Sequence, residues 1–239
     1  MRYLIVLVLM SSCSPLYLSG TRNAPLFKEQ GEAQVSGYLS AAGLEAQVAY
    51  ALSDNIAVIG DFEYANQKKT SNGVEFTRKN TYGEIGLGYY NRTKSARFEM
   101  IAGYGMGEGT SSDVYYFFAP AFGQGTETVA TGKMQRIFFQ PSIGTNNRGT
   151  NLSFTPRVSW VDFSEFTSSG VTVKPNEKAS IFLEPAATLK FHLAGNLFGV
   201  IQVGMTVPIS GEPFFKYQQL QAAVGLQIDT GGLSTKVYK

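Results

Sequence analysis

Apolar and polar residues alternate along most of the chain, and the alternation has a period of two residues. From Ile201 to Ile209, for example, apolar residues at the odd positions are separated by Gln, Gly, Thr and Pro. This period is typical of β-strands, and no segment sustains the 3.6-residue period of an amphipathic helix. The pattern predicts ten strands, at Glu32–Ser40, Leu44–Leu52, Ile56–Ala65, Lys79–Tyr90, Ala96–Gly107, Met134–Thr145, Asn151–Val161, Ala179–His192, Leu197–Ile209 and Phe215–Asp229.

Three features favour a membrane barrel over a soluble sheet. The predicted strands are close to the roughly 9 to 11 residues that cross a bilayer at a tilt. Short connections alternate with long ones, which span residues 66–78, 108–133 and 167–178, and aromatic residues mark the ends of the apolar faces. The fold class that follows is all-β: a closed antiparallel transmembrane barrel with its apolar faces toward lipid. Eight or twelve strands remain alternatives, because Val114–Phe118 could extend a hairpin.

Two prolines, Pro141 and Pro185, fall inside predicted strands. Proline cannot donate a hydrogen bond to a neighbouring strand, so a central strand tolerates it poorly. We therefore expect either a bulge at each proline or a strand limit that lies elsewhere.

Composition excludes several classes of protein. Charged residues make up 16% of the 239 residues, which is below the roughly 25% of an ordinary soluble domain. Past the extreme N-terminus there is no apolar run of about 18 residues, which argues against a helical membrane bundle. A net charge of +2 without a basic cluster gives no footprint for nucleic acid. One Cys and one His predict neither a zinc site nor an internal disulfide, and no cofactor is expected.

The N-terminus has the pattern of a secretory signal. Arg2 precedes the short apolar stretch Tyr3–Met10, and Cys13 follows directly after it. This arrangement resembles a bacterial lipobox, which implies a lipoprotein signal peptide over 1–12 and lipid such as palmitate on Cys13. The alternative is an ordinary secretory signal with an incidental cysteine.

The remaining chain divides into three parts. Residues 13–30 include two prolines and a glycine and show no period, so they are predicted to be an extended tether. The barrel is predicted over residues 31–230, and residues 231–239 form a C-terminal tail.

Several short stretches support a family resemblance. Asn-Ala-Pro-Leu-Phe at 23–27, Gly-Glu at 31–32 and Gln-Val-Ala-Tyr-Ala-Leu-Ser at 47–53 follow the signal and the cysteine. Together they resemble the small lipidated outer-membrane β-barrel proteins of Bacteroidota. The resemblance implies an outer-membrane location and a non-enzymatic role. No acidic residue directly follows Cys13, which favours an anchor in the periplasmic leaflet.

The polar face carries the candidate chemistry. If the apolar faces meet lipid, a charged set points into the lumen: Glu45, Asp61, Glu63, Glu84, Arg97, Glu99, Arg136, Arg157, Glu184 and Lys190. A barrel of this size is narrow, and buried charges are costly unless paired. The bases are therefore expected to meet the acids and to fill the lumen as a plug. A narrow solute or ion channel is the alternative.

Catalysis has weak support in the sequence. The nearby carboxylates of Asp61 and Glu63 could act as acid and base, but the only histidine, His192, is predicted near a short turn. The function that follows is a non-enzymatic structural or accessory subunit beside a larger outer-membrane complex. Its expected partners are membrane lipid and other outer-membrane proteins, and a surface enzyme with a lumenal site ranks third.

Aromatic residues gather in the longest predicted loop, which spans residues 108–133. Contiguous exposed apolar patches commonly mark binding surfaces. The loop is thus predicted to form either a partner surface or a lid over the barrel mouth, through Tyr115, Tyr116, Phe117, Phe118 and Phe122.

Overall fold

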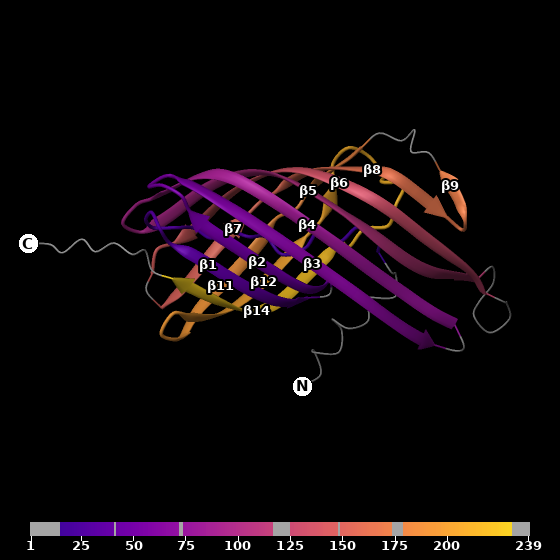
Figure 1. Ribbon diagram of the computed structural model, residues 1–239, viewed down its shortest axis with the longest axis horizontal. Helices are drawn as coiled ribbons and strands as arrows, with labels where there is room; N and C mark the ends of the chain where they lie inside the picture. Colours follow the sequence, from indigo (N-terminus) through magenta and orange to yellow (C-terminus); the bar gives the residue numbers. More distant parts are fainter. Residues whose placement is uncertain are drawn as a thin grey trace, which may run out of the picture.

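A single antiparallel sheet closes on itself into a barrel in the computed structural model, which describes residues 15–40, 42–71, 74–116, 125–147, 149–173 and 179–230 (Figure 1). The strands of the first half are β1 (Ala33–Ser40), β2 (Gly43–Ala51), β3 (Ile56–Ser71), β4 (Val74–Arg92), β5 (Ala96–Tyr116) and β6 (Gly125–Thr145). Those of the second half are β7 (Thr150–Thr155), β8 (Val158–Ser168), β9 (Val171–Val173), β10 (Ser180–Leu183), β11 (Ala186–Ala194), β12 (Leu197–Met205), β13 (Val207–Pro208) and β14 (Leu220–Thr230).

The wall follows chain order, and its first and last strands pair to close it. Ala33 of β1 lies opposite Thr230 of β14, and the pairing runs to Ser40 opposite Ala223. Three strands of the wall are interrupted, and each consists of two short strands in succession: β7 and β8, β10 and β11, and β12 and β13. The short strand β9 lies off the wall and is hydrogen-bonded to β8. The predicted closed barrel of ten antiparallel strands is therefore confirmed.

Two of the three interruptions, those between β7 and β8 and between β10 and β11, lie at a row of prolines. Constant register between the flanking strands places Pro141 opposite Pro156, and Pro156 opposite Pro185. None of these residues has an N–H to donate, so regular pairing fails at the last two. At Pro185 the expected change of strand limit is found, because β10 ends at Leu183 and β11 begins at Ala186. At Pro141 there is neither a bulge nor a strand limit: β6 runs through it in register with β5, and the register shifts lie at Lys133/Met134 and His192/Ala194.

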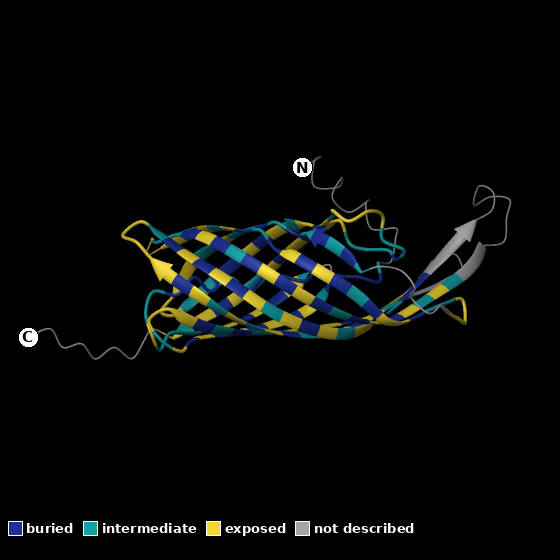
Figure 2. Ribbon diagram, turned by 90° about the horizontal axis from the view of Figure 1, so that it is seen from above, coloured by how far each residue is buried: buried dark blue, intermediate teal, exposed yellow. Residues whose placement is uncertain are grey.

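Apolar side chains cover the outside of the barrel and polar side chains point inward. Along most strands, more buried and more exposed residues alternate (Figure 2), and Ile85 on the outer face is 70% exposed. Exposed aromatics lie at two levels, with Tyr50, Tyr89 and Phe98 toward the short turns and Tyr64, Tyr104 and Trp160 toward the long hairpins. An apolar exterior bounded by aromatic girdles is the arrangement of outer-membrane barrels.

The long connections contain more strand than the sequence predicted. β5 and β6 pair as far as Tyr116 opposite Gly125, within the predicted loop 108–133. β3 and β4 likewise pair as far as Ser71 opposite Val74. These extensions carry polar residues on their outer face, such as the exposed ion pair between Lys133 and Glu165, so the hairpins continue beyond the apolar band. Among the described residues, no helix is long and apolar enough to cross a membrane.

Candidate functional site

Residues 16–27, which belong to the predicted tether over residues 13–30, lie inside the barrel and fill its lumen. Tyr17, Ser19 and Phe27 are fully buried, and most residues from Leu16 to Phe27 are nearly so. The segment is extended, as predicted, but it lies within the barrel. It lacks a hydrophobic period because wall side chains surround it on all sides, so neither face is reserved for solvent.

Aromatic packing closes the lumen at the long-hairpin end. The Tyr17 ring stacks on Phe182 with 5.1 Å between ring centroids, and Phe215 packs against both rings. The backbone N–H groups of Leu16 and Tyr17 both donate to the carbonyl of Lys216 at 3.0 Å. The connection between β13 and β14 thus folds into the mouth, which is why the last strand begins at Leu220 and not at the predicted Phe215.

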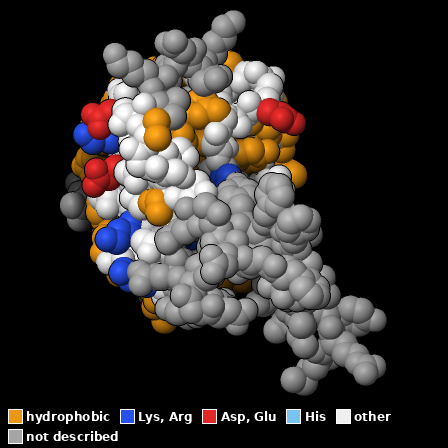
Figure 3. Space-filling view, turned by 90° about the vertical axis from the view of Figure 1, so that its right-hand side faces the viewer, with side chains coloured by type: hydrophobic (Ala, Val, Ile, Leu, Met, Phe, Trp, Pro, Cys, Tyr) orange, Lys and Arg blue, Asp and Glu red, His pale blue; other side chains and the backbone are white. Residues whose placement is uncertain are grey.

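The loop aromatics predicted to form a partner surface or a lid are not among the described residues of this aromatic cluster. Tyr115 and Tyr116 end β5, and only their backbone is described. Phe117, Phe118 and Phe122 lie outside the described residues, as does Cys13. Seen from the long-hairpin end, most of the charged side chains in view lie along one side of the molecule, and an acidic group lies on the opposite side (Figure 3).

Two arginines meet one carboxylate at the centre of the lumen. Arg136 forms an ion pair with Glu84, and Arg157 Nη1 lies 3.1 Å from Glu84 Oε1. All three side chains are at most 1% exposed. Each guanidinium also lies over an aromatic ring, Arg136 over Tyr82 at 4.5 Å and Arg157 over Phe138 at 4.4 Å. Charge, hydrogen bonds and cation–π contacts together satisfy groups that would otherwise be costly to bury.

A second acidic centre ties the segment to the wall. Glu184 accepts hydrogen bonds from Tyr17 Oη and Ser159 Oγ, both at 2.7 Å. Its carboxylate also lies 4.0 Å from Arg22 of the segment. Tyr17 Oη accepts from Arg136 at 3.1 Å, so the phenol links the two acidic centres.

Wall side chains also satisfy the backbone of the segment. The amide of Arg22 donates to Gln202 Oε1 at 2.6 Å, and Gln202 Nε2 returns a bond to the Arg22 carbonyl at 3.0 Å. Gln140 Nε2 donates to the carbonyl of Asn23 at 2.8 Å. Buried backbone groups need such partners, so these glutamines let the segment stay extended without pairing as a strand.

The predicted acids are held mostly by the segment. Glu45 accepts from the backbone N–H and the hydroxyl of Thr21, both at 2.5 Å. Asp61 accepts from Asn23 Nδ2 at 2.6 Å, and Glu99 accepts from the amide of Leu26 at 2.8 Å. Glu63 faces Gly20, where a Cβ atom would lie 1.7 Å from its Oε1.

Two predicted bases have partners other than the expected acids. Lys190 Nζ lies 2.5 Å from Asp229 Oδ2. Arg97 donates to Asn146 Oδ1 at 2.9 Å and to the carbonyl of Leu26 at 3.2 Å. The structure therefore brings Arg136 and Arg157 together with Glu84, but it does not bring Arg97 or Lys190 to the acids expected for them.

Arg22, Tyr17 and Asn23 are the residues that sequence reasoning missed. The sequence does contain an indication of Arg22, because the predicted lumenal set has more acidic than basic residues and so needs another base. Arg22 is the only charged residue between Ser14 and Phe27, so it was the one base that the N-terminal segment could add to the lumen.

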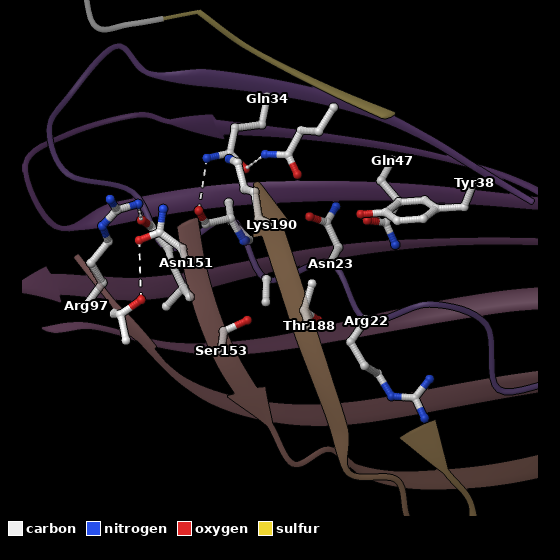
Figure 4. A pocket seen from close by; sticks show the side chains of 15 residues that line it. Arg22, Asn23, Gln34, Tyr38, Gln47, Arg97, Asn151, Ser153, Thr188 and Lys190 are labelled. Carbon is white, nitrogen blue, oxygen red and sulfur yellow. Dashed lines mark hydrogen bonds between the residues drawn. The ribbon is translucent and has the colours of Figure 1, made fainter. Parts of the chain in front are cut away.

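A polar cavity of about 40 Å³ lies in the short-turn half of the lumen (Figure 4). It is bounded by Asn23 and by wall residues such as Gln34, Arg97, Thr188 and Lys190. A water molecule needs roughly 10–15 Å³ measured in this way. The cavity thus has room for water but not for an organic solute.

Within the described residues there is no group of three His, Cys, Asp or Glu side chains placed to hold a metal ion. His192 is exposed near the C-terminal end of β11, and its Nε2 lies 2.9 Å from the Gly195 carbonyl. Asp61 and Glu63 both lie against the segment, Asp61 at Asn23 and Glu63 at Gly20.

No protein-family model matches the sequence, and no curated protein matches it. Among solved structures, the chain is similar to the translocator domain of the autotransporter NalP from Neisseria meningitidis. The identity is 10%, the match covers 82% of this chain and 86% of that one, and the TM-score is 0.45. The β domain of the Bordetella autotransporter BrkA is 8% identical over 84% of this chain and 99% of that one, with a TM-score of 0.34. The P. putida toluene transporter TodX is 6% identical over 90% of this chain and 94% of that one, with a TM-score of 0.30. The likeness is one of overall fold. The chain's own closed antiparallel sheet and apolar exterior make it an outer-membrane β-barrel.

Proposed function

We propose that the protein is a self-plugged, non-enzymatic outer-membrane barrel that is closed to solutes and serves as an accessory or structural membrane protein. One observation carries the proposal: residues 16–27 occupy the lumen and are bonded to its wall from the aromatic cluster to the short-turn end. The side chains of Glu84, Arg136 and Arg157 at the centre of the lumen are at most 1% exposed, which supports a closed lumen.

Conductance in planar bilayers tests the plug. The full-length protein is expected to show no steady conductance. A variant in which residues 16–27 are replaced by a Gly-Ser chain of equal length should conduct, because the lumen then contains water. The same replacement of residues 231–239 is the control and should remain closed.

Folding of each variant is checked by the heat-dependent shift in gel mobility that folded barrels show in detergent. Steady conductance of the full-length protein would refute the plug and favour the narrow channel. A folded Gly-Ser variant that stays closed would show that wall side chains alone seal the lumen.

The lipid anchor is a separate part of the proposal, supported by the signal pattern and by Cys13. Metabolic palmitate labelling of the protein is expected and should be lost in Cys13→Ala. A wild-type protein without label, whose mature N-terminus lies elsewhere, would leave an ordinary secretory signal.

The accessory role predicts a neighbouring outer-membrane protein. Crosslinking in native membranes followed by mass spectrometry should capture one reproducibly. If the aromatics near residue 116 contact that partner, Tyr116→Ala and Phe118→Ala should reduce its co-purification without changing barrel stability. If they form a lid, the same variants should lower stability or raise conductance instead.

A further inference from the structure

The two ends of the barrel wall lie at the same rim. β1 starts at Ala33 and β14 ends at Thr230, and these residues are paired. The same rim carries the short turns, because Gly31 donates to the carbonyl of Ala51, just before the turn into β3. The chain thus enters the wall from the short-turn end.

From that rim, the segment ascends the lumen in one direction when it is followed back toward the N-terminus. Phe27 contacts Tyr90 near the short turns, with 5.7 Å between the ring centroids. Leu26 is bonded to Glu99 of β5, whereas Leu16 lies against Gly109 of the same strand. Ten residues of segment therefore run alongside ten residues of strand, so the segment has no room to turn back.

Leu16 reaches the level at which the outer surface becomes polar. Gly109, which Leu16 touches, directly follows Glu108, and Glu108 is paired with Lys133. Lys133 forms the exposed ion pair with Glu165 described above. Charged groups on the outside of a membrane barrel lie beyond its apolar band, so Leu16 lies at the membrane surface on the long-hairpin side.

We infer that the chain leaves the barrel at the long-hairpin mouth, so that whatever precedes Pro15 is displayed on the outside of the cell. In outer-membrane barrels the short turns face the periplasm and the long loops face the exterior. The inference rests on the proposed plug and adds the direction in which the segment runs through the lumen. Cys13 is two residues from Pro15, hence within about 7 Å of it along the backbone. A lipid on Cys13 would therefore enter the outer leaflet and not the periplasmic leaflet expected from the sequence.

Epitope accessibility on intact cells tests the direction. A short epitope is inserted between Ser14 and Pro15, and in a second protein the same epitope follows Lys239. Antibody should bind the first epitope on intact cells at least tenfold above background, and the second only after the outer membrane is permeabilised. A third protein combines the first insertion with Cys13→Ala and should behave like the first, because the lumenal path does not depend on lipid.

The outcomes separate the two proposals. An N-terminal epitope detected only after permeabilisation would overturn the direction of threading. If that same protein is also closed in planar bilayers, the plug itself stands. If that protein conducts steadily, the segment is not in the lumen, and both the plug and the direction of threading are refuted. Conductance therefore distinguishes failure of both proposals from failure of the direction alone.

Discussion

Replacing Arg136 with alanine should be among the most damaging single changes in the lumen. The guanidinium forms the ion pair with Glu84, donates to Tyr17 Oη at 3.1 Å and to the Ser19 carbonyl at 3.2 Å, and lies over the Tyr82 ring. Because the side chain is 1% exposed, water cannot replace these contacts without entering the lumen.

The magnitude follows from what is left behind. Removing one member of a buried ion pair costs about 3–5 kcal/mol, because the other charge stays buried. Here Arg157 remains 3.1 Å from Glu84 and keeps part of the compensation. The free energy of unfolding of Arg136→Ala should therefore fall by about 3 kcal/mol, at the lower end of that range. The double variant with Arg157→Ala should lose more than the sum of the two single losses, since it leaves Glu84 without a base.

The measurement is urea unfolding of the barrel in lipid vesicles, followed by tryptophan fluorescence. Trp160 is the only tryptophan and lies on the outer face, so its emission reports when the wall leaves the lipid. Lys133→Ala breaks the exposed pair with Glu165 and serves as the matched control, with no measurable change expected. An Arg136→Ala barrel that unfolds at the same urea concentration as the wild type would refute the buried ion-pair reasoning.

Three further changes probe other parts of the structure. Gly20→Ala should destabilise the plug by about 1–3 kcal/mol, because Gly20 has a φ of +61° and an added Cβ would collide with Glu63. Gly37→Ala is the control, because an added Cβ there meets nothing within 4 Å. Equal unfolding curves for the two variants would contradict the close approach of Gly20 to Glu63. Tyr17→Phe keeps the stacking on Phe182 but removes the hydrogen bond that the Tyr17 hydroxyl donates to Glu184. The free energy of unfolding in the same assay should therefore fall by about 1–3 kcal/mol. Unchanged stability would show that water supplies the missing hydrogen bond. Ile85→Lys places a charge on the most exposed apolar position of the outer face and should cost about 2–4 kcal/mol in a bilayer; unchanged stability would mean that this face does not meet lipid.

The wall could be predicted from the sequence because each strand has two different environments. Lipid on one side and polar lumen on the other impose the period of two that runs through β12 and β14, and ten of the predicted segments correspond to crossings of the wall. The inward direction of Arg136, Glu84 and Glu184 follows from the same alternation.

The content of the lumen could not be predicted in the same way. Residues 15–27 have a single environment, because wall side chains surround them on every side, so their sequence carries no period. The partner of Lys190 depends on the register between β11, β12 and β14, which brings Asp229 to it from the far end of the chain. Phe215 was assigned to a strand because it precedes an alternating stretch, yet its ring packs in the aromatic cluster of the mouth.

The pairing of β1 with β14 makes the polypeptide pass through a ring composed of itself. Chains rarely thread through closed elements, and here the hydrogen bonds between β1 and β14 join the first and last strands of the ring. The segment is synthesised before every strand of the wall, so it can be enclosed if the β1–β14 seam is the last to close. A folded domain fused ahead of Pro15 is too large to be drawn through the filled lumen afterwards. The order in which strands pair during assembly, more than the strength of any one contact, thus decides what this barrel can carry at its N-terminus.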